Sequence, residues 1–124
     1  MTPRSPSPTT FSGGAGHVTG PWIYFGAVSV QFRPSTRTTK KIVAVFTLDN
    51  GRTRTVHFGQ AGAGDYTQHR DPARKQRYLA RHAPREDWDM PMTAGALSRW
   101  ILWNKKTLHS SIHDYARRFD LALA

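Results

Sequence analysis

Hydrophobic and polar residues alternate over the first apolar stretch of the chain, residues 22–32, which read WIYFGAVSVQF. Val28, Val30 and Phe32 occupy alternate positions, so we expect a β-strand that buries one face. Gly26 interrupts this pattern and predicts a bulge or a bend in the strand. The stretch is therefore expected to form the first strand of a sheet.

Two further strands are predicted around a tight turn. Residues 42–48 are rich in Val, Ile and Phe, and residues 52–58 form the return strand. Between them stands Asp49-Asn50-Gly51, and an Asn-Gly pair supplies the positive φ angles that a tight hairpin turn requires. Side chains alternate along a strand, so one face of the return strand should carry Arg52, Arg54, Val56 and Phe58.

Three helices are predicted in the second half of the chain. Asp71 and Pro72 indicate a helix that runs from Ala73 to about His82, because aspartate caps free N–H groups and proline suits the first helical position. Threonine caps indicate two more helices, over residues 94–103 and from residue 108 to about residue 121. The last helix carries its hydrophobic residues at helical spacing, which is typical of a face that packs in a core.

Strands followed by helices predict an α+β fold, in which three helices pack on one face of a small three-stranded antiparallel sheet. We assign this domain to residues 21–124. Residues 1–20 are dominated by Pro, Ser, Thr and Gly and cannot bury enough surface to offset their ordering entropy. They are expected to form a flexible arm.

The composition narrows the class of protein. The chain has 124 residues, a formal net charge of +10 and no cysteine. The lack of cysteine excludes disulfide scaffolds, cysteine-ligated zinc, iron–sulfur clusters and thiol catalysis. No apolar run reaches about 18 residues, so we expect no membrane-spanning helix. No hydrophobic secretion-signal core follows Arg4, so the protein is expected not to be secreted.

The positive charge is concentrated in two segments. Residues 31–58 carry six Lys or Arg against Asp49, and residues 66–85 carry six against Asp71. Such clustering favours a polyanionic partner, most simply the phosphates of a nucleic acid. The residues that we expect to contact phosphate lie on the basic helix, just before it and on the strands: Lys40, Lys41, Arg52, Arg54, Arg70, Arg74, Lys75, Arg77 and Arg81.

A long run in the second half of the chain resembles a known family. It includes the basic helix and the block Thr93–Trp103, which reads TAGALSRWILW. The run from Val56 to Phe119 is similar to small uncharacterised proteins of large nucleocytoplasmic DNA viruses and some algae, catalogued only as a domain of unknown function. The resemblance implies a viral or virus-derived protein that works on or near packaged DNA, in the virion or in the host nucleus or cytoplasm. It brings no activity, cofactor or catalytic residue.

Histidines leave a metal-dependent alternative open. His109 and His113 lie four residues apart on the last predicted helix, a spacing that metal-binding helices use, but the glutamate of the zinc-protease pattern is missing. His57, His69 and His82 form a second candidate cluster that could hold a general base or a metal with nearby aspartates. Surface and structural roles are the interpretations that we favour for these two groups.

An acidic patch and a glycine-rich stretch are two further candidate motifs. Glu86, Asp87 and Asp89 surround Trp88, and clustered carboxylates hold metal ions in nucleases. We favour salt bridges from this acidic patch to Arg81, Arg85 and Arg99 instead. The glycine-rich stretch 59–64 lacks the Gly-Lys-Ser/Thr ending of a phosphate-binding loop, so a plain turn is the favoured interpretation.

The sequence therefore predicts a non-enzymatic protein that contacts the phosphate backbone of nucleic acid without sequence specificity, since no base-reading motif is present. A structural adaptor or minor capsid or assembly protein, which binds an acidic viral protein, is the alternative, and a small metal-dependent nuclease is the third hypothesis. No cofactor, metal or small-molecule substrate is expected. Trp100 and Trp103 suit stacking on bases, although their helical spacing among Leu and Ile is more typical of a core.

Overall fold

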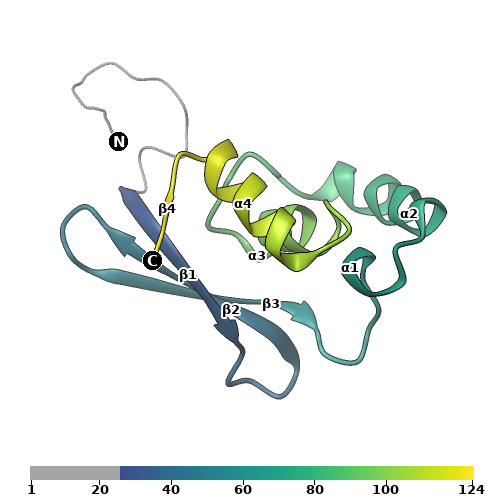
Figure 1. Ribbon diagram of the computed structural model, residues 1–124, viewed down its shortest axis with the longest axis horizontal. Coiled ribbons are helices and arrows are strands. Elements are labelled where there is room, and N and C mark those ends of the chain that lie inside the picture. The colour runs from purple at the N-terminus through teal and green to yellow at the C-terminus, as the bar shows by residue number, and fades with distance from the viewer. Residues whose placement is uncertain (1–25) are drawn as a thin grey trace.

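A four-stranded mixed sheet lies beside a layer of helices in the computed structural model, which describes residues 26–124 (Figure 1). β1 (Ala27–Pro34), β2 (Lys40–Leu48) and β3 (Thr53–Gln60) pair antiparallel, and β4 (Ala122–Leu123) pairs in parallel with β1. The order in the sheet is β3-β2-β1-β4. The expected arm, residues 1–20, and the expected beginning of the first strand lie outside the described residues.

The first strand departs from the predicted alternation at one residue. Ala27 pairs with Leu48 and Ser29 pairs with Thr47, so β1 holds one extra residue, Val28, at this point. This bulge turns the side chain of Val28 outward, where it is 48% exposed. Val30 regains the inner face and is fully buried. The expectation that Val28 shares the buried face is therefore wrong, whereas the irregularity signalled by Gly26 is present.

The helical layer contains more elements than predicted. α2 (Pro72–His82) and α4 (Leu108–Arg118) match predicted helices, and the predicted helix over residues 94–103 consists of α3 (Ala94–Leu97) and a π-helical turn, η3 (Ser98–Leu102). Two more elements, α1 (Tyr66–His69) and a 3₁₀ turn, η2 (Ala83–Arg85), have no counterpart among the predicted ones. Within residues 26–124, no helix is both long and apolar enough to cross a membrane.

The core lies between one face of the sheet and the helices. Val30, Phe46 and Phe58 are fully buried and point from β1, β2 and β3 to the same side, as their register requires. The helical layer meets them with Leu97, Ile101 and Leu102 from α3 and η3 and with Tyr115 and Phe119 from α4 and its end. This arrangement agrees with the predicted α+β class and with helices on one face of the sheet.

The last helix ends earlier than predicted because the chain reverses at Asp120. This residue adopts a left-handed φ of 55°, and the backbone N–H of Leu121 bonds the carbonyl of Ala116 at 2.8 Å, as in helix C-caps. The reversal leads the chain into β4 beside β1, where Ala124 donates to Val30 at 3.0 Å. Two strand residues are too few to give a sequence pattern, so this strand was missed.

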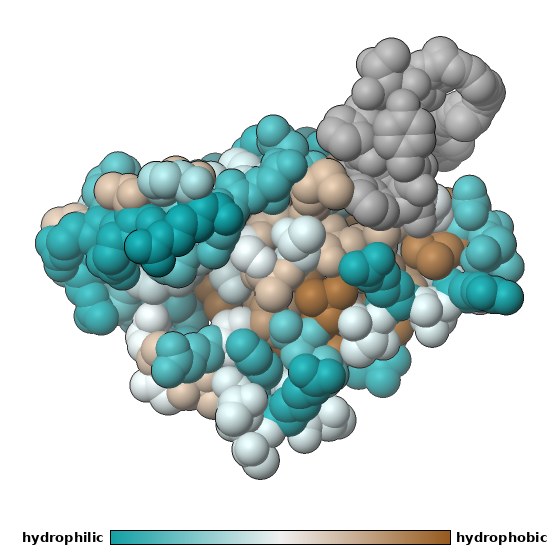
Figure 2. All heavy atoms as spheres, turned by 180° about the vertical axis from the view of Figure 1, so that it is seen from behind, coloured by the Kyte–Doolittle hydropathy of each residue, from teal (hydrophilic) through white to brown (hydrophobic). Residues whose placement is uncertain are grey.

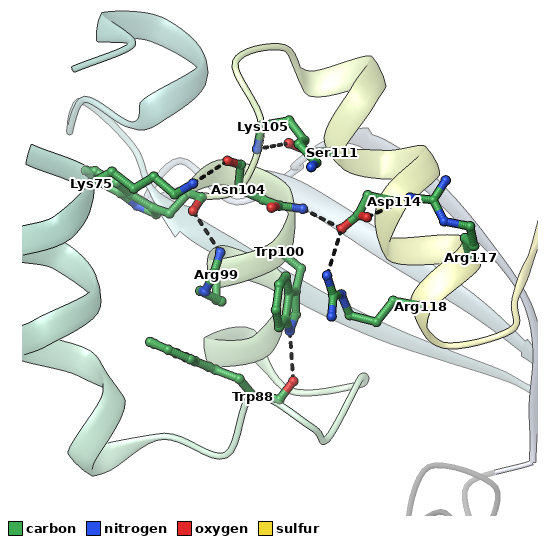
Figure 3. Close-up of polar contacts among 11 residues, drawn as sticks. Lys75, Trp88, Arg99, Trp100, Asn104, Lys105, Ser111, Asp114, Arg117 and Arg118 are labelled. Atoms are coloured by element: carbon green, nitrogen blue, oxygen red, sulfur yellow. Dashed lines mark hydrogen bonds and ion pairs between the residues drawn. The ribbon is translucent and has the colours of Figure 1, made fainter. Parts of the chain in front are cut away.

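A polar network holds α2, η3 and α4 together (Figure 3). The side chain of Asn104 donates to Asp114 at 2.7 Å, and the Asn104 carbonyl accepts from the Lys75 ammonium at 2.7 Å. Arg117 and Arg118 also bind Asp114. Burial alone would raise the pKa of Asp114, but the Asn104 and Arg118 contacts outweigh burial and hold that pKa below its usual value.

Candidate nucleic-acid interface

A hollow of about 730 Å³ opens between α2 and the end of the sheet. It is lined by the start of β2, the end of β3 with the glycine-rich loop that follows, α2, and the α3–η3 segment. We call this hollow the basic pocket. Figure 2 shows the molecule from behind, so the side that carries α2 in Figure 1 is on the left. Hydrophilic residues gather on that side, and hydrophobic atoms are visible toward the centre of the view.

Cations from both basic segments of the sequence line this pocket. Lys40 comes from the first segment, and Arg74, Arg77 and Arg81 come from the second. None of these four side chains has a carboxylate within 4.0 Å in the part of the chain that the structure describes. A fifth lining cation, Lys41, is held by Asp65 at 2.6 Å. The pocket therefore presents several uncompensated positive charges to one space.

The two acidic residues of the lining are engaged in bonds within the chain. Asp65 is 3% exposed, binds Lys41 and accepts the backbone N–H of Thr67 at 2.9 Å as the cap of α1. Glu86 accepts from the Trp88 indole at 2.8 Å and lies 3.0 Å from His82 Nδ1. Asp65 is thus paired with Lys41, whereas Glu86 keeps its charge but makes no ion pair with an arginine of the lining among residues 26–124.

Helix α2 presents its arginines to the pocket because of its cap and its spacing. Asp71 caps the helix by accepting the backbone N–H of Ala73 at 3.0 Å, and Pro72 occupies the first turn. Arg74, Arg77 and Arg81 then fall at i, i+3 and i+7 on one face, as the sequence predicts.

Two predicted contact residues serve the fold instead of the pocket. The Lys75 ammonium bonds the Asn104 carbonyl at 2.7 Å and lies 4.8 Å from the centre of the Tyr66 ring. Burial, together with Arg99 and Lys105 nearby, lowers the pKa of Lys75. Arg70 donates to the Lys106 carbonyl at 3.0 Å and takes a left-handed φ of 55°.

Arg52 and Arg54 lie at the opposite end of the sheet. Lys40 pairs with Gln60 at the pocket end of the β2–β3 ladder, and Arg54 pairs with Phe46 six residues further along β2. At about 3.3 Å per residue, this separates the two ends by about 20 Å. The predicted contact row of Lys40, Lys41, Arg52 and Arg54 is therefore split between two places.

A stack of aromatic rings forms one wall of the basic pocket. The Trp103 and Tyr78 rings are 4.3 Å apart and nearly parallel, at 4°, and the Tyr78 and His82 rings are 4.2 Å apart at 25°. All three residues line the pocket. Burial is the main cause of a strongly raised Tyr78 pKa, so its hydroxyl stays protonated near neutral pH. This stack was not predicted, although the i, i+4 spacing of Tyr78 and His82 on the basic helix was the available signal.

Trp100 has no free ring face for a ligand. The guanidinium of Arg118 lies 3.8 Å from its ring centre and that of Arg99 lies 4.1 Å away. Its indole N–H donates to the Trp88 carbonyl at 2.8 Å (Figure 3). This tryptophan joins α3–η3 to α4 and belongs to the packing of the helical layer.

The candidate metal clusters are not assembled within residues 26–124. The structure places no group of three or more His, Cys, Asp or Glu side chains there that could hold a metal ion. His57 bonds Ser35 at 2.8 Å, His69 accepts from the backbone of Asp71 at 3.0 Å, and His82 faces Glu86. The rings of His109 and His113 lie 4.4 Å apart on the exposed side of α4.

The expectation that the acidic patch forms salt bridges with Arg81, Arg85 and Arg99 is wrong. Glu86 binds His82 and Trp88, and no ion pair joins the patch to an arginine in the described part of the chain. Arg99 instead lies over the Trp88 and Trp100 rings and donates to the Trp103 carbonyl at 2.9 Å. The two rings and this carbonyl engage the Arg99 guanidinium, so it does not pair with the acidic patch.

The glycine-rich loop borders the pocket. Gly59, Gln60, Ala63 and Gly64 all belong to its lining, and the Arg74 guanidinium lies 3.7 Å from the position where a Cβ of Gly64 would stand. The predicted plain turn thus lies against the basic face of α2.

Comparison with known proteins finds a family match over part of the chain. A model of a family of unknown function (DUF5754) matches residues 30–82. These residues include most of β1, all of β2 and β3, the glycine-rich loop, α1 and α2. The block Thr93–Trp103, on which the resemblance described above depends, lies beyond the matched residues. No curated protein and no solved structure matches the chain.

Proposed function

We propose that this protein binds nucleic acid through the phosphate groups, with the basic pocket as its principal contact site and without sequence specificity or catalysis. The observation that carries the proposal is the convergence of Lys40, Arg74, Arg77 and Arg81, without carboxylate partners among residues 26–124, on one hollow. Arginine matches phosphate oxygens through paired N–H donors, and contacts of this kind give affinity without reading bases.

The tertiary arrangement supports a focused site over a general charge effect. Lys40 and Arg77 are far apart in the sequence yet line the same space, whereas Arg52 and Arg54 lie about 20 Å away at the other end of the β2–β3 ladder. A hollow in which positive charges outnumber negative ones, as here, concentrates anionic ligands more strongly than a flat surface does.

A charge-matched pair of double variants tests the proposal. Arg77→Gln/Arg81→Gln removes two charges from the pocket, and Arg52→Gln/Arg54→Gln removes two charges from the distant end of β3. Binding of random-sequence DNA, single-stranded and duplex, is measured by fluorescence anisotropy over a series of salt concentrations. We expect the pocket variant to lose affinity and to reduce the salt slope by about 2, since each lost phosphate contact removes about one counterion.

The distant variant is the control and should keep most of both the affinity and the slope. Equal losses from the two variants would show that only net charge matters and would refute the pocket as the site. The absence of binding at about 50 mM salt would refute the function itself, because phosphate contacts are strongest at low salt.

An acidic protein partner is the alternative for the same cations. Recovery of a nuclease-resistant protein complex would favour it, together with no binding of DNA at low salt. The viral or algal context suggested by the resemblance belongs to this proposal too, with the protein on packaged DNA in the virion or in the host cell.

A further inference from the structure

We infer that the basic pocket accepts a nucleotide whose base is unpaired, with the base stacked on His82 and the phosphates on the surrounding arginines. The ligand class is a nucleoside phosphate, supplied by a single strand or as a free nucleotide. This inference rests on the proposed function and specifies which form of nucleic acid the site selects.

His82 is the last ring of the aromatic stack, and its side chain is partly exposed. The order of the stack is Trp103, Tyr78, His82, and Tyr78 is 7% exposed because it is covered on both sides. The His82 side chain keeps 38% of its surface exposed although Tyr78 stacks on one face, and His82 lines the pocket, so part of the ring is open to this space. A planar base placed there would add one more ring to a stack that the protein already forms.

The imidazole is held in one orientation. Its Nδ1 lies 3.0 Å from a Glu86 carboxylate oxygen, and the second oxygen of Glu86 accepts the Trp88 indole N–H at 2.8 Å. Gly95 leaves the space that Glu86 occupies, since a Cβ there would come within 3.0 Å of its carboxyl carbon. A ring fixed in this way loses little conformational freedom when a base stacks on it.

Two arginines of the pocket lie within about one and a half helical turns of this ring. Arg81 precedes His82 on α2, and Arg77 precedes Tyr78 one turn earlier, so the arginine row and the ring row run side by side along the helix. Lys40 and Arg74 complete the lining near the glycine-rich loop. Base and phosphate of one nucleotide can therefore meet their partners together.

The shape of the site favours an unpaired base. A duplex covers both faces of its bases with neighbouring pairs, and only an unstacked base offers a face to an aromatic side chain. The hollow has about 730 Å³ and is bordered by Phe58 and Leu102 as well as by the cations. Pockets of about 300–1,000 Å³ with an apolar lining and a few polar groups are typical of small-molecule sites.

Oligonucleotides with and without bases test the inference. The probes are a fluorescein-labelled thymidine 12-mer, an abasic 12-mer with the same number of phosphates, and a 12-base-pair duplex. We expect the thymidine strand to bind at least about fivefold more tightly than the abasic strand, since stacking of one base on an aromatic side chain is worth about that factor or more. The duplex should bind with no gain over the abasic strand at equal phosphate concentration.

Variants assign the effect to the ring. His82→Ala should bring the ratio of the two affinities, thymidine strand over abasic strand, down to about one, whereas His82→Phe should keep the ratio of the wild type. His113→Ala, an exposed histidine on α4, is the matched control and should behave as the wild type. Far-UV circular dichroism verifies that each variant is folded, and retention of the preference in His82→Phe establishes the stacking role if His82→Ala is unstable.

The possible outcomes distinguish failure of this inference from failure of the proposed phosphate-binding function. Equal, salt-dependent binding of thymidine and abasic strands would overturn the inference and leave phosphate binding standing, whereas no binding of any probe would overturn both. Competition by free thymidine monophosphate, but not by thymidine, would support a free nucleotide as the source. Base-dependent binding of the strand without such competition would support a single strand.

Discussion

Replacing Gly59 with alanine tests how closely the end of β3 must approach the helical layer beside the basic pocket. Gly59 has a φ of +81°, a conformation that residues with a Cβ rarely adopt. A Cβ at this position would lie 2.7 Å from a methyl carbon of Leu102 and 3.3 Å from the Cβ of Lys41. Leu102 is 4% exposed and packed in the core, so it has little room to move away.

The expected cost follows from these two effects. The left-handed backbone costs about 1–2 kcal/mol for a residue with a Cβ. Overpacking a core against a methyl group costs about 1–3 kcal/mol more. Gly59→Ala should therefore lower the free energy of unfolding by about 2–5 kcal/mol. Gly51 has a φ of +86° and nothing within 4 Å of its missing Cβ, so Gly51→Ala should cost only the backbone part, about 1–2 kcal/mol.

Urea denaturation of the two variants and the wild type measures both costs under the same conditions. The double variant Gly59→Ala/Leu102→Ala adds a further check, because truncation of the leucine side chain makes space for the new methyl group. Its loss of unfolding free energy should therefore be smaller than the sum of the losses in the two single variants. A loss of stability in Gly59→Ala no greater than in Gly51→Ala would refute the close contact with Leu102. Full additivity in the double variant would do the same.

Two further predictions concern the polar groups of the helical layer. The pKa of Asp114 is lowered in the folded state, so its stabilising contribution is present above the unfolded value and is lost as the pH falls through the folded value. The stability difference between the wild type and Asp114→Asn should thus shrink between about pH 5 and about pH 2 in urea titrations, and a constant difference would contradict the assignment. The buried hydroxyl of Tyr115 donates to the Pro91 carbonyl at 2.6 Å, so Tyr115→Phe should cost about 1–3 kcal/mol in thermal unfolding, and a neutral result would show that water replaces the bond.

Local signals in the sequence predicted most elements of the fold. The Asp49-Asn50-Gly51 turn, the Asp71 cap and the Thr93 and Thr107 caps all act within a few residues, and each marks an element boundary in the structure. The other elements were missed for two different reasons. α1 has a capping box at Asp65 and Gln68, but its four residues are too few to give a hydrophobic pattern. β4 has two residues and depends on a partner strand distant in the sequence.

The candidate site was predictable only in part. The arginine face of α2 follows from helical spacing, and these cations line the pocket. Lys75 and Arg70 donate to the backbone carbonyls of Asn104 and Lys106. These roles could not be predicted, because the carbonyls belong to a turn about 30 residues later in the chain. The same holds for the stack of Trp103 on Tyr78, which joins two helical segments.

The sequence by itself determined an α+β chain with a basic helix and an excess of positive charge, since periodicity, caps and composition are local or additive properties. Only the tertiary structure decided which cations share a space. Folding places Lys40 beside the arginines of α2, carries Arg52 and Arg54 to the far end of the sheet, and directs Lys75 into the helical layer. Packing of the core fixes these positions, because the buried faces of the strands and helices decide on which side of each element its charged residues lie.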